Sequence, residues 1–221
     1  LGAELLYTFS KSIDNASSFG AGGGTVAQDD RNLRAERALS NFDQRHRLGF
    51  SYIWNSSFGD SGSLLHGGGW RSVLLGNWTV GGTVFIVSGT PFTARVLGNR
   101  ADSGGTGAIG AGRADATGFP VTQGSGFFNV SAFTTPPSGR FGNAARNTIP
   151  GPRSAVANIA LARSFRLGGD RRRLEFRAEC ANATNHVNIN SLGTVVNSSE
   201  YGFALGAQAM RTVMLHLRMG F

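Results

Sequence analysis

Histidine and cysteine are the side chains of this sequence best suited to bind a metal ion or to act as nucleophiles. The four histidines are His46, His66, His186 and His216, and the single cysteine is Cys180. No histidine lies two to four residues from another histidine or from the cysteine. Protein zinc sites are usually built from such closely spaced ligands. His46 also stands between two arginines, whose positive charge opposes a bound cation. The spacing therefore predicts no metal site.

Catalytic and cofactor motifs are equally weak. Gly105-Thr-Gly107-Ala-Ile-Gly110 matches the G-x-G-x-x-G pattern. That pattern binds a dinucleotide only where it follows a strand and begins a helix, and here it lies in glycine-rich chain with neither. A G-x-S-x-G elbow, which would indicate a serine nucleophile, is absent from the sequence. Cys180 occupies an apolar position of a strand pattern, where a small buried or lipid-facing residue is expected. We therefore expect no catalytic residue, no cofactor and no enzyme activity.

The net charge of +8 raises the question of nucleic-acid binding. Nucleic-acid surfaces usually carry a clustered basic stripe or a recognisable motif. Lys11 is the only lysine, and the arginines are spread along the chain. The densest run, Arg171 to Arg173, follows Gly168-Gly169-Asp170, which is typical of a tight turn. The charge pattern therefore predicts no nucleic-acid partner.

Alternation with a period of two is the clearest structural signal, and it indicates strands with unlike faces. One face of residues 173–180 is apolar, while the other carries Arg173, Glu175, Arg177 and Glu179. The last residues repeat the pattern, with Val213, Leu215, Leu217, Met219 and Phe221 on one face. Six strands are predicted, at about 3–10, 43–54, 76–90, 155–166, 172–183 and 209–221. No apolar run is long enough for a membrane-spanning helix.

The connections between these strands alternate in length: long, shorter, long, short and long. This order is typical of an antiparallel up-and-down transmembrane barrel whose long loops share one side. We therefore expect residues 1–221 to adopt an all-β fold of this barrel type. The charged ladder at 173–179 would face a wet lumen. The expected aromatic girdle at the bilayer interface comprises Trp54, Phe58, Trp70, Trp78 and Phe165. A soluble β-sandwich binding module also alternates, so it stays an alternative.

Several blocks of the sequence resemble the barrel of TonB-dependent receptors of the Oar-like, carboxypeptidase-regulatory-like group. In chain order they are Tyr7–Asp14, Asn41–Trp54, Val87–Thr93, Phe128–Phe133, Phe141–Asn147 and Phe176–Glu179. The terminal Phe221 behind alternating apolar residues is similar to the signal read by the outer-membrane insertion machinery.

The resemblance implies the last six strands of a plugged barrel of about 22 strands in a Gram-negative-type outer membrane. The C-terminus would be periplasmic, and the plug and the N-terminal domains would lie upstream of Leu1. The implied partners are outer-membrane lipid, the insertion machinery, the TonB system and an unidentified transported ligand. A surface adhesion or export-related barrel without uptake is the alternative function.

Overall fold

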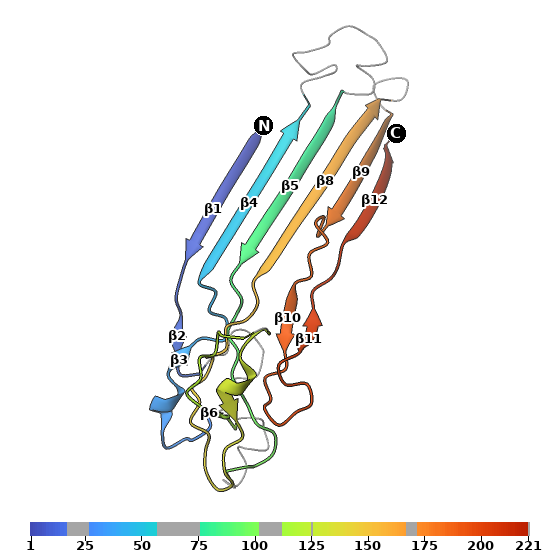
Figure 1. The fold of residues 1–221 in the computed structure, drawn as a ribbon. Coiled ribbons are helices and arrows are strands. Elements are labelled where there is room, and N and C mark those ends of the chain that lie inside the picture. Colours follow the sequence, from blue (N-terminus) through green and yellow to red (C-terminus); the bar gives the residue numbers. More distant parts are fainter. Residues whose placement is uncertain (17–26, 57–75, 102–111, 125, 167–171, 221) are drawn as a thin grey trace.

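The main element of the fold is one antiparallel sheet of six strands (Figure 1). The computed structural model describes residues 1–16, 27–56, 76–101, 112–124, 126–166 and 172–220. The strands are β1 (Gly2–Phe9), β4 (His46–Asn55), β5 (Trp78–Val87), β8 (Ser154–Arg166), β9 (Arg173–Ala181) and β12 (Thr212–Gly220), in that spatial order. Each long strand pairs with the next one along the chain, so the predicted all-β up-and-down topology is confirmed. The observed bounds differ from the expected ones by at most three residues.

The sheet is open, with β1 and β12 as its two edges (Figure 1). A sandwich would require two large sheets stacked face to face. The described residues instead form this sheet and three two-stranded ones. Helical structure in the described ranges is limited to short 3-10 turns such as η1 (Leu33–Glu36) and η3 (Val130–Ala132). None of the helices found there is long and apolar enough to cross a bilayer.

The three long connections gather at one end of the sheet (Figure 1). We call the described residues of 10–45, 88–153 and 182–211 the loop assembly. It contains the pairs β2 (Ile13–Asp14) with β3 (Ala38–Leu39), β6 (Asp115–Ala116) with β7 (Phe133–Thr134), and β10 (Ile189–Leu192) with β11 (Ala204–Ala207). The described part of the connection at 88–153 therefore contains regular structure, namely β6, η3 (Val130–Ala132) and β7.

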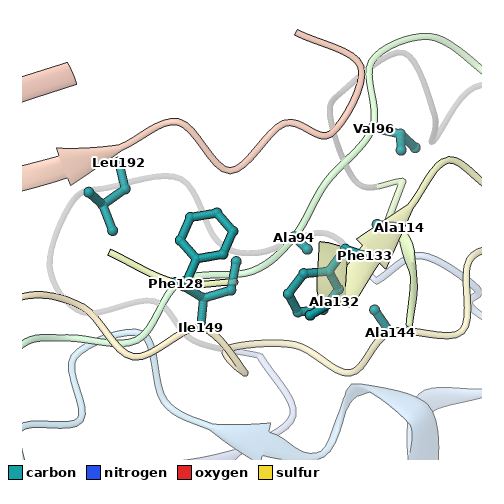
Figure 2. Close-up of a cluster of buried hydrophobic side chains, with 9 residues drawn as sticks. All are labelled: Ala94, Val96, Ala114, Phe128, Ala132, Phe133, Ala144, Ile149 and Leu192. Atoms are coloured by element: carbon teal, nitrogen blue, oxygen red, sulfur yellow. The ribbon is translucent and has the colours of Figure 1, made fainter. Parts of the chain in front are cut away.

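The buried hydrophobic core lies in the loop assembly and not on the sheet. Among the described residues, nine side chains form it: Ala94, Val96, Ala114, Phe128, Ala132, Phe133, Ala144, Ile149 and Leu192 (Figure 2). Large apolar side chains of the sheet are exposed instead, including Leu215 at 68% and Leu217 at 71%. The sheet therefore requires an apolar environment that the described residues do not supply.

Candidate functional site: a two-faced wall and its loop assembly

Strand register divides the sheet into two chemically different faces. Directly opposed residues of antiparallel neighbours carry their side chains on the same face. Leu161 lies opposite Ala178, which lies opposite Leu215, and the adjoining row aligns Ile159, Cys180 and Val213. Across β1, β4 and β5 the same face carries Leu5, Tyr7, Phe9, Leu48, Phe50, Tyr52, Trp54, Trp78, Val80, Val84 and Ile86. We call this the apolar face.

The apolar face has the height of a membrane hydrocarbon layer. β4 has ten residues, which extend about 33 Å at about 3.3 Å per residue. A strand tilt of about 40° reduces this to about 25 Å along the membrane normal, the usual height of the apolar band of a transmembrane barrel. The predicted C-terminal series places Val213, Leu215, Leu217 and Met219 on this face. Phe221 lies outside the described residues.

Aromatic side chains lie at both ends of the apolar face. Trp54, Trp78 and Phe165 lie near the end with the short connections. At the loop end, the Tyr7 hydroxyl lies 2.8 Å from His46 Nδ1, and the Phe9 ring is 5.3 Å from the His46 ring. Tyrosine and tryptophan favour membrane interfaces because they combine an apolar ring with a polar atom. The other expected girdle residues, Phe58 and Trp70, lie outside the described part of the chain.

Arg163 is a charged side chain on the apolar face that sequence reasoning did not single out. It lies opposite Trp78 on β5 and is 6% exposed. Its guanidinium carbon lies 5.0 Å from the centre of the Trp78 ring and 4.5 Å from that of Phe165. Such cation–π contacts stabilise an arginine by about 0.5–2 kcal/mol. Its alternation with Leu161 and Phe165 is the sequence signal that would have located it.

The opposite face, which we call the polar face, carries the predicted charged ladder. Arg173, Glu175, Arg177 and Glu179 alternate with the apolar residues of β9 and share one side of the sheet. Arg177 Nη2 lies 2.5 Å from Glu179 Oε1, so this ion pair forms within the strand. Across the register, Glu175 lies opposite Arg218 of β12, and Arg177 lies opposite His216.

A hollow of about 830 Å³ lies along the sheet and is lined largely from the polar face. Its lining includes Glu4, Ser51, Thr83, Asn158 and Arg177, which come from five different strands. The sheet is therefore concave on its polar side. A curved wall with this polarity encloses a hydrated interior and presents its apolar side outward.

A buried ion network joins two of the three long connections. Glu36 is 2% exposed and accepts hydrogen bonds from Arg113 Nη1 and from the Gln28 backbone N–H, both at 3.0 Å. Arg146 Nε donates to the Glu36 carbonyl oxygen at 2.9 Å, and its Nη2 donates to the Asp14 carboxylate at 2.7 Å. Burial lowers the pKa of Arg113, and the Glu36 charge opposes that shift.

The third connection is attached through an aromatic contact and a hydrogen bond. The Tyr201 and Phe128 rings meet edge to face, with centroids 5.5 Å apart. The Tyr201 hydroxyl donates to the Val130 carbonyl oxygen at 3.1 Å. Burial raises the pKa of Tyr201 to about 12. The loop assembly is therefore one packed unit that includes parts of all three connections.

The described residues contain no group of three or more histidine, cysteine, aspartate or glutamate side chains able to hold a metal ion. His66 and the stretch Gly105–Gly110 lie outside the described part of the chain. The arrangement offers a membrane-contacting face, a hydrated face and a folded loop surface.

A family model described as an outer membrane beta barrel domain matches residues 1–213. No curated protein and no solved structure matches the chain.

Proposed function

The chain belongs to the outer membrane β-barrel domain family, and we propose that it forms part of the wall of a TonB-dependent receptor that takes up a ligand. It is an outer-membrane protein, and lipid covers its apolar face. The family match favours the barrel over the alternative of a soluble β-sandwich.

The observation that carries this proposal is the concave polar face. Both edges of the sheet have unpaired backbone groups, which cannot stay unpaired within a bilayer. Further strands must therefore complete the wall. The hollow of about 830 Å³ would then be part of a lumen wide enough to hold a plug or a passing solute.

Orientation follows from the distribution of the connections. Long loops of transmembrane barrels face the outside, and short turns face the periplasm. The loop assembly would therefore lie outside the cell, with the C-terminus in the periplasm. Ligand would bind the loop assembly and the plug, and TonB would then rearrange the plug. In this mechanism the chain makes and breaks no bond, and it needs no cofactor.

The first test is to read the coding frame upstream of Leu1. A plug domain with a TonB-contacting segment and about sixteen further alternating strands would support the receptor proposal. Strands without a plug would favour an adhesion or export-related barrel. The intact protein, extracted in detergent, should also change its gel mobility on heating, as folded barrels do. A frame that begins close to Leu1 would overturn the large single-chain barrel.

A further inference from the structure

A pocket of about 430 Å³ lies in the loop assembly, beside η1 and the β2–β3 pair. Its lining consists of Ile13, Asp14, Asn15, Leu33, Arg34 and Arg37. β2 supplies the first two of these residues, and η1 supplies Leu33 and Arg34. Both elements lie on the β1 side of the loop assembly (Figure 1). Cavities of about 300 to 1,000 Å³ hold small molecules. We call this cavity the η1 pocket.

Hydrogen bonds hold both sides of the η1 pocket in place. On one side, Arg146 Nη2 donates to the Asp14 carbonyl oxygen at 3.1 Å and to the Asp14 carboxylate at 2.7 Å. On the other side, the buried Glu36 carboxylate at the end of η1 accepts from Arg113 Nη1. Arg146 Nε donates to the Glu36 carbonyl oxygen, so one guanidinium connects the two sides. The pocket is therefore preformed, which lowers the entropy cost of binding.

Arg34 and Arg37 give the η1 pocket a positive charge. Both side chains are exposed, and no carboxylate of the described residues forms an ion pair with either of them. Asp14 also lines the pocket, but the buried Arg146 guanidinium neutralises its carboxylate. Guanidinium groups bind carboxylates and phosphates through charge-assisted hydrogen bonds. The pocket therefore attracts an anion and repels a metal cation.

Ile13 and Leu33 add an apolar surface to the η1 pocket. Their side chains are 46% and 54% exposed, and they come from its two different sides. Removing such a surface from water is favourable. A bare inorganic anion would leave both side chains in water, whereas a molecule with an apolar body would cover them. The lining is therefore complementary to an amphipathic anion.

We propose that the η1 pocket binds small amphipathic anions, meaning soluble molecules that carry a carboxylate or phosphate group on an apolar body. Arg34 and Arg37 hold the acidic group, and the apolar body lies against Ile13 and Leu33. Asn15 supplies a neutral amide that donates to, or accepts from, a polar substituent. That such molecules reach the pocket from outside the cell as cargo rests on the proposed function, whereas the binding itself does not.

The first test uses phenylbutyrate, a soluble molecule with one carboxylate and one apolar body. Its binding to the intact protein in lipid nanodiscs is measured by isothermal titration calorimetry, and empty nanodiscs correct for partitioning into lipid. The neutral amide of phenylbutyrate keeps the apolar body, and acetate keeps the carboxylate. Each should bind at least about tenfold more weakly than phenylbutyrate. Equal affinity for phenylbutyrate and its neutral amide would overturn the proposal, because the arginines would then not contribute to binding.

Two variants with the same loss of charge locate the site. Arg34→Gln/Arg37→Gln removes both cations of the η1 pocket, whereas Arg153→Gln/Arg211→Gln removes two exposed arginines that do not line it. The first variant should lose phenylbutyrate affinity about tenfold per arginine, and on the order of a hundredfold in total. The second should stay within about twofold of the parent. Unchanged hydrogen exchange at 112–116 verifies that the loop assembly is folded. Equal affinities in the two variants would overturn the proposal.

Leu33→Gln tests the apolar contact separately. It should weaken the binding of phenylbutyrate about fivefold and leave the binding of acetate unchanged. Unchanged phenylbutyrate affinity in this variant would overturn the amphipathic class of ligand. The binding and uptake proposals also fail separately. A coding frame without a plug would overturn uptake and not the binding, whereas a folded protein that does not bind phenylbutyrate would overturn the η1 pocket and not uptake.

Discussion

The Glu36 carboxylate accepts a 3.0 Å hydrogen bond from the Arg113 guanidinium, although the two residues are 77 positions apart and are only 2% and 5% exposed. Arg146 Nε lies 3.6 Å from the same carboxylate. One buried anion thus faces two arginines from a different connection. Buried charges are expensive unless they are paired, so this anion fixes the arrangement of the first two long connections.

Glu36→Gln should loosen the loop assembly while leaving the sheet intact. The substitution leaves two buried guanidinium groups with the Asp14 carboxylate as the remaining anion of the network. Breaking a buried pair by neutralising one partner costs about 3 to 5 kcal/mol. Hydrogen exchange at 112–116 and 142–147 should accelerate accordingly. Asp30→Asn, which removes an exposed carboxylate, is the control and should leave exchange unchanged. Unchanged exchange in Glu36→Gln would mean that the network does not hold the connections.

The sheet could be predicted from the sequence, but the loop assembly could not. The alternation of apolar and polar residues along a strand shows which residues share a face, as it does in β9 and β12. The local sequence pattern is therefore enough to predict such a strand. The contact between Glu36 and Arg113 produces no periodic pattern in the sequence, because the two residues are far apart along the chain. Glycine-rich composition is typical of flexible connections, yet Gly142 packs directly against the backbone carbonyl of Arg113. Glycine at this position allows two backbone segments to approach each other closely. Amino-acid composition does not distinguish such a glycine from one in a flexible segment.

Gly82→Ala should destabilise the wall, whereas Gly81→Ala should not. A methyl group at Gly82 would lie 2.7 Å from Cε1 of the Tyr52 ring and 2.8 Å from the Asn158 carbonyl oxygen. The same group at Gly81 would lie 3.5 Å from its nearest neighbour, an ordinary contact. Overpacking of this kind costs about 1 to 3 kcal/mol. The two variants are unfolded with urea in detergent micelles, and the folded fraction is read from heat-dependent gel mobility. The measured quantity is the urea concentration at the unfolding midpoint. Equal midpoints for the two variants would contradict the close packing of Tyr52 on Gly82.

Tyr201 should make the loop assembly sensitive to alkaline pH. Its pKa is raised by burial to about 12, against an ordinary value of 10.0. Below pH 10 the phenol is protonated in both folded and unfolded loops, so stability does not depend on it. Between about pH 10 and about 12 the unfolded loop releases the proton first, so stability falls as pH rises. Proteolysis of the loop assembly should increase across that window in the parent and less in Tyr201→Phe. A rise of the same size in both would exclude Tyr201 as the cause.

Adjacent residues of β12 should differ sharply in the solvent that reaches them. His216 lies on the polar face and Leu217 on the apolar face. In a Cys180→Ala background, a membrane-impermeant thiol reagent applied from both sides should label His216→Cys at least about tenfold faster than Leu217→Cys. The reason is that the reactive thiolate forms in water and not in hydrocarbon. A lipid-soluble maleimide is the control. It should label Leu217→Cys, which would show that this variant is folded, inserted and able to react. Equal labelling of both positions by the impermeant reagent would show that water reaches both faces, and the apolar face would then not contact lipid.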